Sequence, residues 1–178
     1  MVLANHRDGY DFIKIYNDID PDVFDALVAT SREVGLPIVG HVTFAKGLDG
    51  ALAARQDSIE HLRAYDFAAD TRTPPGTARF EGWLYSTPER LAELAERTVA
   101  AGVWNCPTLV VQLKPPADGA PPPRDYAGLP PWLADMLEGL RLRQSSGIFT
   151  AAQLRALGDG EPYRMAMVAA LDRAGPNF

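Results

Sequence analysis

Three short apolar runs near the start of the chain each carry one side chain that could bind a metal ion: Lys14, His41 and His61. Lys14 and His41 are 27 positions apart, and His41 and His61 are 20 positions apart, which is about what one strand–helix–strand step needs. We therefore expect each side chain to arrive at the same end of neighbouring parallel strands. Parallel α/β proteins place their chemistry at that end.

Alternation predicts the face of the sheet on which each residue lies, because side chains two positions apart in a strand share a face. Ile13 and Ile15 are expected to face the covering helices. The side chains expected to point inward, toward the site, are Phe12, Lys14, Tyr16, Val39, His41, Ile59 and His61.

Lys14 has apolar neighbours in its own strand, and burial among them would disfavour its ammonium form and make the neutral amine accessible. A neutral amine can take up carbon dioxide to become a carbamate, an anionic oxygen ligand able to bridge two metal ions. His41 and His61 would supply neutral nitrogen donors of the kind zinc prefers, and an open zinc site turns bound water into hydroxide near neutral pH. Taken singly, each residue has a plainer interpretation: a rim lysine that reaches water, and histidines that are structural.

The composition is that of a globular chain with an acidic balance. Its 178 residues are 47% hydrophobic and 22% charged, which is enough for one sizeable core. The net charge of -6 comes without a stripe of Lys and Arg, which argues against a nucleic-acid binder. The single Cys106 excludes an internal disulfide and fits a reducing, cytoplasmic setting. No segment approaches the ~18 apolar residues of a membrane span, so no membrane partner is expected.

Turn chemistry and apolar periodicity predict alternating strands and helices. Between the first two strands, Asp20 is the expected N-cap, Pro21 the first helical residue and Gly35 the end signal. The buried stripe expected on that helix consists of Val23, Phe24, Leu27, Val28 and Val34. The expected strands are 11–16, 37–42, a brief one ending at 61, and 103–111; the expected helices are 1–7, 20–35, 47–55, 63–69, 87–101, 132–143, a short one from 150, and 161–174.

Residues 114–131 are rich in proline and predict an extended surface insertion, either a cover over a pocket or a plain linker. The chain is otherwise expected to form a single domain over 1–178. Four parallel strands with helices between them are about half of an eight-stranded barrel, which typically needs ~250 residues. The predicted fold class is therefore α/β, a partial (β/α)8 TIM barrel.

Three motifs carry a family resemblance. Gly9-Tyr-Asp-Phe-Ile-Lys14-Ile-Tyr16, Gly35-Leu-Pro-Ile-Val-Gly-His41-Val42 and Ser58-Ile-Glu-His61-Leu62 closely resemble the metal-dependent amidohydrolase superfamily, in particular its imidazolonepropionase-like and Xaa-Pro dipeptidase-like branch. The resemblance implies that Lys14 lies on strand four and is carbamylated, and that His41 and His61 end strands five and six. It also implies that Trp104-Asn-Cys-Pro-Thr-Leu-Val-Val111 is strand seven.

The chain departs from that family at both ends. The family's first strand carries a His-x-His pair, and its eighth strand carries an Asp that serves as ligand and general base. This chain has three histidines, of which His6 lies in the leading helix without a partner at that spacing, and it stops at Phe178, about where strand eight would begin. Half of the family's metal ligands and its general-base Asp are therefore not expected here.

Five further residues lie close to the expected site in sequence or in the predicted strands. Alternation turns Glu60 away from the face of its neighbouring histidine, so we expect it to pair with a basic residue on a helix. Cys106 is expected to be a buried small hydrophobe, not a thiolate ligand. Asn105, Tyr16 and Tyr85 could face the pocket, and no role is assigned to them.

The sequence thus predicts a metal-dependent hydrolase of amide or cyclic amide C–N bonds, with zinc held by Lys14, His41 and His61 and metal-bound hydroxide attacking the carbonyl. The isolated chain is expected to be incomplete as an enzyme. The expected partners are a small-molecule or dipeptide-like substrate and another copy of the chain, joined through open sheet edges. Two alternatives remain open: a non-catalytic half-barrel that self-associates, and a small α/β binding module whose histidines are structural.

Overall fold

Four short parallel strands form the centre of the structure, a computed structural model that describes residues 1–109, 128–135 and 150–175. The strands lie in chain order and every neighbouring pair is parallel, which confirms the predicted α/β alternation. The last strand is shorter than expected, because it ends before Pro107, which has no N–H to donate. The strands are β1 (Ile13–Ile15), β2 (Ile38–Gly40), β3 (Ser58–Glu60) and β4 (Trp104–Cys106).

Helices connect the strands and end as their capping residues predict. In α2, Asp20 precedes Pro21, and the chain leaves the helix through Gly35 in the left-handed conformation, at a φ of 70°. At the start of α7, Thr150 and Gln153 form the predicted reciprocal capping box. The helices are α1 (Val2–Arg7), α2 (Pro21–Val34), α3 (Gly47–Ala53), α4 (Tyr65–Ala69), the 3-10 helix η1 (Glu81–Tyr85), α5 (Pro88–Ala100), α7 (Ala151–Asp159) and α8 (Glu161–Ala174).

The buried face of α2 differs from the predicted stripe at one position. Phe24 and Leu27 are buried as expected, whereas Val23 is 55% exposed. Ser31, about one turn beyond Leu27, takes a buried position instead. The prediction that Val23 is buried is therefore wrong. The buried face of α2 includes fewer residues than the apolar positions of its sequence.

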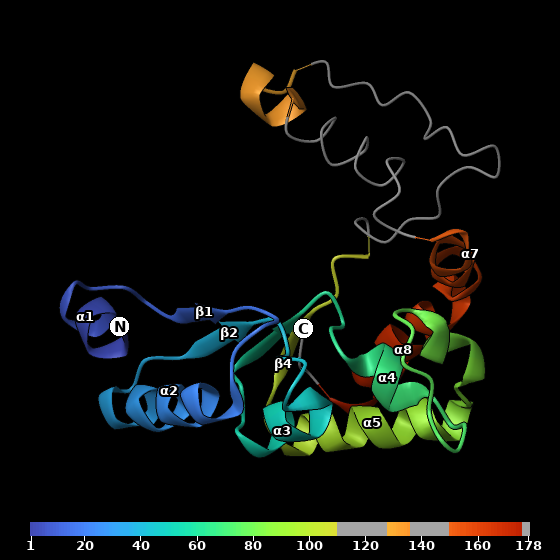
Figure 1. Cartoon of the computed structure of the whole chain (residues 1–178), viewed down its shortest axis with the longest axis horizontal. Coiled ribbons are helices and arrows are strands. Elements are labelled where there is room, and N and C mark those ends of the chain that lie inside the picture. Colours follow the sequence, from blue (N-terminus) through green and yellow to red (C-terminus); the bar gives the residue numbers. More distant parts are fainter. Residues whose placement is uncertain (110–127, 136–149, 176–178) are drawn as a thin grey trace.

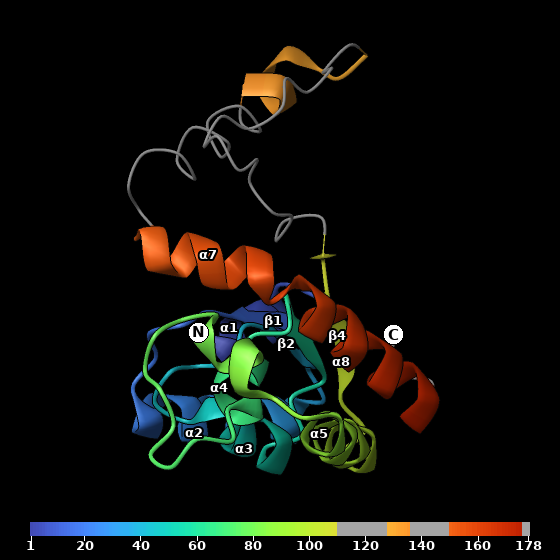
Figure 2. The same cartoon turned by 90° about the vertical axis from the view of Figure 1, so that its right-hand side faces the viewer.

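One face of the sheet is covered by helices. Ile13, Ile15, Ile38 and Ile59 are each at most 3% exposed. The first three pack in one apolar cluster with α2, and Ile59 packs in a second cluster with residues of α3, α5 and α8. Figures 1 and 2 show α2, α3 and α5 along this side of the sheet. The isoleucines of β1 therefore meet the covering helices, as alternation predicts.

The opposite face, here called the open face, has accessible side chains. The strand register places Lys14 in one row with Trp104 at the far edge, and the described part of the chain leaves Lys14 exposed and Trp104 49% exposed. The residues of the open face are Lys14, Val39, Ser58, Glu60, Trp104 and Cys106.

The segment after α4, predicted as a loop, is organised by a buried carboxylate. Asp70 accepts a hydrogen bond from Arg72 Nη2 at 2.6 Å and one from the Gly76 backbone N–H at 2.8 Å. The Arg72 side chain is the main cause that lowers the pKa of Asp70 to about 2. These bonds fix the loop that leads into η1.

Some predicted features lie outside the described residues. Of the proline-rich insertion at 114–131, only 128–131 are described, and the strand predicted for 103–111 is described only up to 109. Of the helix predicted for 132–143, the described part is helical at 131–135. The single-domain organisation over 1–178 stays a prediction. Within the described ranges, every helix is too short or too polar to cross a bilayer.

Candidate metal centre

Two imidazole rings meet just beyond the carboxyl ends of β2 and β3. The ring centroids of His41 and His61 lie 5.0 Å apart, and the ring planes meet edge to face at 82°. The backbone N–H of His41 donates to the Ile15 carbonyl at 3.1 Å, and that of His61 donates to the Cys106 carbonyl at 2.8 Å. Bonds to neighbouring strands therefore fix both residues, although each lies one position past its own strand.

His61 reaches its partner ring because the chain leaves the strand conformation there. The φ of His61 is 62° and that of Leu62 is 50°, so alternation no longer decides where the imidazole points. The prediction that Ile59 shares the inward face with His61 is wrong. Ile59 is 0% exposed and lies on the helix-covered side of the sheet.

The His41 ring is held on two sides. The Tyr16 ring stacks on it with centroids 4.1 Å apart, and Asn17 Oδ1 lies 2.7 Å from His41 Nδ1. Because an amide oxygen only accepts, Nδ1 donates and Nε2 carries the lone pair available for ligation. Burial is the main cause that lowers the pKa of His41 to about 4, and the charge of Arg63 acts in the same direction.

His61 is held in a similar way by a residue beyond β4. Its Nδ1 contacts the Thr108 hydroxyl. Burial lowers the pKa of His61, the Glu60 carboxylate opposes this effect, and the charge of Lys14 adds to it. Both imidazoles are therefore neutral near pH 7, which is the protonation state that a metal ligand requires.

The sequence reasoning missed the two residues that orient these rings, Asn17 and Thr108. Asn17 comes directly after the apolar run of β1, and Thr108 follows β4 by two positions. A polar side chain just past the carboxyl end of a parallel strand was the available signal.

Lys14 lies on the open face, and its charge is among the causes that lower the pKa values of both His41 and His61. The prediction that Lys14 is buried and desolvated is wrong. Lys14 is exposed, and so are Phe12 at 50% and Tyr16 at 61%. The physical reason is that the isoleucines on either side of the lysine point to the other face, so apolar neighbours in sequence do not surround its amine.

Glu60 and Cys106 lie side by side on the open face, because the register of β3 and β4 pairs them. Glu60 accepts a hydrogen bond from Ser58 Oγ at 3.0 Å, and among the described residues it forms no ion pair with a basic side chain. Cys106 is exposed, so the prediction that it is buried is wrong. Partial burial and the Glu60 carboxylate raise the pKa of the Cys106 thiol. The physical reason is that the register of β3 and β4 places Cys106 on the open face and not on the face that the helices cover.

The three residues without an assigned role, Asn105, Tyr85 and Tyr16, lie in different surroundings. Asn105 is 4% exposed and lies in register with Ile59 on the covered face. The Tyr85 ring lies beneath the Arg72 guanidinium, 3.6 Å from its carbon. Of the three, Tyr16 is the one that contacts a candidate ligand, His41.

The histidine pair fits a metal ion of the zinc type. Zn–N distances are about 2.0–2.1 Å, so two rings whose centroids are 5.0 Å apart are close enough to share one ion. Outer partners that fix the ring orientation, here Asn17 and Thr108, are usual for ligating histidines. In the described part of the chain, no group of three or more His, Cys, Asp and Glu side chains is placed to hold a metal. A third ligand from the described residues would therefore have to be of another type, such as Lys14.

Comparison with known proteins decides the fold. No protein-family model matches the chain, and no curated protein sequence matches it. Among solved structures, bottromycin amidohydrolase aligns with a TM-score of 0.54 and 24% sequence identity. The fold is amidohydrolase-like. The alignment covers 99% of this chain and 45% of bottromycin amidohydrolase, so the chain spans less than half the length of that protein.

An amidohydrolase-like fold agrees with the parallel sheet and with the position of the histidine pair at its carboxyl ends. At 24% identity the likeness concerns the fold.

Proposed function

We propose that this chain forms strands four to seven of the (β/α)8 barrel of a metal-dependent amidohydrolase, of the imidazolonepropionase-like or Xaa-Pro dipeptidase-like branch. The observation that carries the proposal is the meeting of two neutral imidazoles, 5.0 Å apart, at the carboxyl ends of parallel strands and near a lysine. The amidohydrolase-like fold supports it. The reaction is hydrolysis of an amide or cyclic amide C–N bond in a small-molecule or dipeptide-like substrate.

The ligands in this proposal are His41, His61 and Lys14. Zinc, when bound, supplies the Lewis acidity that activates water near neutral pH. His41 binds through Nε2, because Asn17 holds its Nδ1, and Lys14 binds as a carbamate. The carbamate forms when the neutral Lys14 amine adds to carbon dioxide and releases a proton to water, and the exposure of Lys14 lets both molecules reach the amine. A reducing, cytoplasmic setting belongs to the same proposal.

Zinc affinity tests the proposal directly. His41→Ala and His61→Ala are each expected to weaken zinc binding by about 10- to 100-fold, because each removes a nitrogen ligand. Competition with a chromogenic chelator, followed on the purified chain, measures the affinity. His6→Ala is the matched control, because His6 lies in α1, and it should leave the affinity unchanged. Equal zinc affinity in all three variants and the wild type would rule out the histidine pair as a metal site.

Bicarbonate separates the role of Lys14 from that of the histidines. Added bicarbonate should strengthen zinc binding by the wild type, and Lys14→Arg should remove this dependence while keeping the positive charge. Hydrolysis of amide, lactam and dipeptide substrates by the zinc-loaded chain then tests the activity. Bicarbonate-dependent affinity that persists in Lys14→Arg would exclude the carbamate.

A second candidate function, self-association, is favoured by the accessible apolar side chains of the sheet. Trp104 is 49% exposed, and β1 and β4 each pair on one side within the described sheet, so both edges offer unpaired backbone groups. Trp104→Lys is expected to weaken a dimer by about tenfold, and sedimentation across a concentration series measures it. Trp132→Lys is the control, since Trp132 is exposed outside the sheet. A chain that stays monomeric at all concentrations would exclude this candidate.

A further inference from the structure

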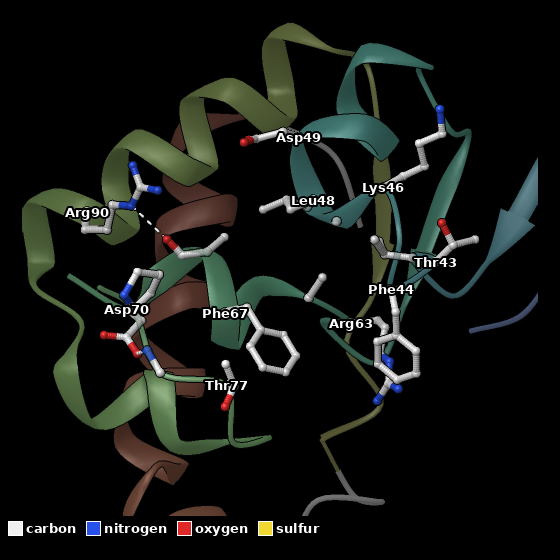
Figure 3. A pocket seen from close by; sticks show the side chains of 16 residues that line it. Thr43, Phe44, Lys46, Leu48, Asp49, Arg63, Phe67, Asp70, Thr77 and Arg90 are labelled. Carbon is white, nitrogen blue, oxygen red and sulfur yellow. Dashed lines mark hydrogen bonds between the residues drawn. The ribbon is translucent and has the colours of Figure 1, made fainter. Parts of the chain in front are cut away.

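A pocket of about 490 Å³ lies beside the candidate metal centre, between the loop after β2, α4 and the segment that follows α4. Its lining does not include the candidate ligands Lys14, His41 or His61. Figure 3 shows Phe44 and Arg63 together at one end of it, and Asp70 and Arg90 at the other. Its apolar walls include Val42, Leu48, Phe67 and Ala68.

Arg63 is the unusual member of this lining. Its side chain belongs to a residue that is 8% exposed, and its guanidinium carbon lies 4.8 Å from the centre of the Phe44 ring. Among the described residues, no carboxylate lies within ion-pair distance of the guanidinium and no acceptor takes a hydrogen bond from it. Burial lowers the pKa of Arg63, while the carboxylate of Asp66 acts on it through space in the opposite direction. A buried cation of this kind calls for an anionic partner.

The other charged residues of the pocket already have partners. Lys46 Nζ lies 2.7 Å from the Asp25 carboxylate, and Arg90 Nη1 lies 2.7 Å from that of Glu93. Arg90 also donates to the Ala68 carbonyl at 2.9 Å. The two acidic lining residues are paired with arginines outside the lining, Asp49 with Arg97 and Asp70 with Arg72. Among the charged lining residues and their described neighbours, the positive charge of Arg63 is therefore the one left for a ligand.

A second polar group in the lining also lacks a partner in the part of the chain that the structure describes. Thr43 is 1% exposed, and within the described structure its Oγ1 has no hydrogen-bond partner. Thr43 and Phe44 follow His41 by two and three positions, so a ligand near Arg63 would lie beside the histidine pair. Buried polar groups of this kind are normally satisfied, and an oxygen-bearing ligand would satisfy both.

We propose that this pocket is a binding site for a small monocarboxylate with an apolar body, held by a two-pronged hydrogen bond from Arg63. A guanidinium fork matches the two oxygens of a carboxylate. The single unbalanced charge matches one carboxylate better than a phosphate dianion, which would need further donors. The apolar walls receive the body of the ligand. The site goes beyond the proposed hydrolase function, because it requires neither zinc nor the candidate ligands.

Phenylacetate is a suitable probe, with phenylacetamide as its neutral analogue and inorganic phosphate as the competing anion. Titrations followed by NMR on the whole chain, freed of metal beforehand and kept in a carboxylate-free buffer, give the affinities. We expect phenylacetate to bind saturably and about tenfold or more tightly than phenylacetamide, because the amide cannot form the charged pair. Phosphate should bind more weakly than phenylacetate.

Variants locate the site. Arg63→Gln should weaken phenylacetate binding by about tenfold or more, and Arg63→Lys should weaken it less, because it keeps the charge and loses the fork. Arg7→Gln is the control: it removes an arginine of α1, outside the lining, that is already paired with Asp8, and binding should stay within about twofold. Arg63→Lys and the comparison of acid with amide on the wild type remain decisive if Arg63→Gln does not fold.

Three results would overturn the site: no saturable binding of phenylacetate, equal affinity for acid and amide, or an unchanged affinity in the folded Arg63 variants. Tighter phosphate binding that depends on Arg63 would replace the carboxylate by a phosphate ligand and so refute the proposed class. The outcome for the zinc site is independent of the outcome for this pocket. A His41→Ala, His61→Ala double variant that still binds phenylacetate supports this site whatever its zinc affinity is.

Discussion

Replacing Gly82 with alanine is expected to lower the free energy of unfolding by about 4 kcal/mol, which is at the upper end for one substitution. A Cβ at Gly82 would lie 1.8 Å from the Asp66 carbonyl oxygen and 2.8 Å from its carbonyl carbon. Both are backbone atoms, so no side-chain rotation removes the clash, and α4 and η1 must separate. Trp83, the next residue, is 2% exposed and would lose its packing as they do.

Urea denaturation of both proteins, followed by tryptophan fluorescence, measures this loss. Gly102→Ala is the matched control: Gly102 has a φ of 71° and nothing within 4 Å of its added Cβ. The Gly102→Ala substitution should lower the free energy of unfolding only by the strain of a left-handed alanine, about 1 kcal/mol. Similar losses in the two variants would show that η1 and α4 are not packed as closely as the structure has them.

Gly40→Ala should have the second largest effect, a loss of about 3 kcal/mol in the free energy of unfolding. Gly40 has a φ of 116°, and an added Cβ would lie 2.4 Å from the Ile15 carbonyl oxygen. That oxygen accepts the hydrogen bond from the His41 backbone. The substitution therefore pushes β1 away from β2 and releases the first histidine of the candidate centre.

Two measurements separate these consequences. Urea denaturation gives the loss of stability, and zinc competition on the folded variant should show weaker binding than in the wild type. Gly47→Ala is the control, because Gly47 also has a positive φ, 60°, but has open space around its added Cβ, and it should cost about 1 kcal/mol. A stable Gly40→Ala variant with unchanged zinc affinity would contradict the close approach of β1 and β2.

The order of elements could be predicted from the sequence because local signals determine it. Asp20, Pro21 and Gly35 mark the two ends of α2, and Thr150 with Gln153 marks the start of α7, as the structure has them. The spacing of the two histidines also predicted that they meet, because each follows a parallel strand by one residue.

The surroundings of each candidate ligand could not be predicted in the same way, because they depend on partners distant in sequence. Alternation placed Lys14 opposite the isoleucines of β1, but whether a face is covered depends on where helices pack. The turn of His61 toward His41 follows from a left-handed residue, which no residue type signals there. Glu60 and Cys106 are neighbours only through the register of β3 with β4.

The buried isoleucines of β1 also determine the face of the sheet on which the Lys14 side chain lies. With three residues in each strand, a slide of β1 by a single position would bring Ile13 and Ile15 to water and turn the amine of Lys14 toward the helices. Selection for apolar packing of Ile13 and Ile15 on the covered face is thus, at the same time, selection for the position of Lys14 on the open face. Substitutions of Ile13 and Ile15 by smaller residues would hold the register of β1 less firmly, and so would alter the position of the Lys14 amine without changing Lys14 itself.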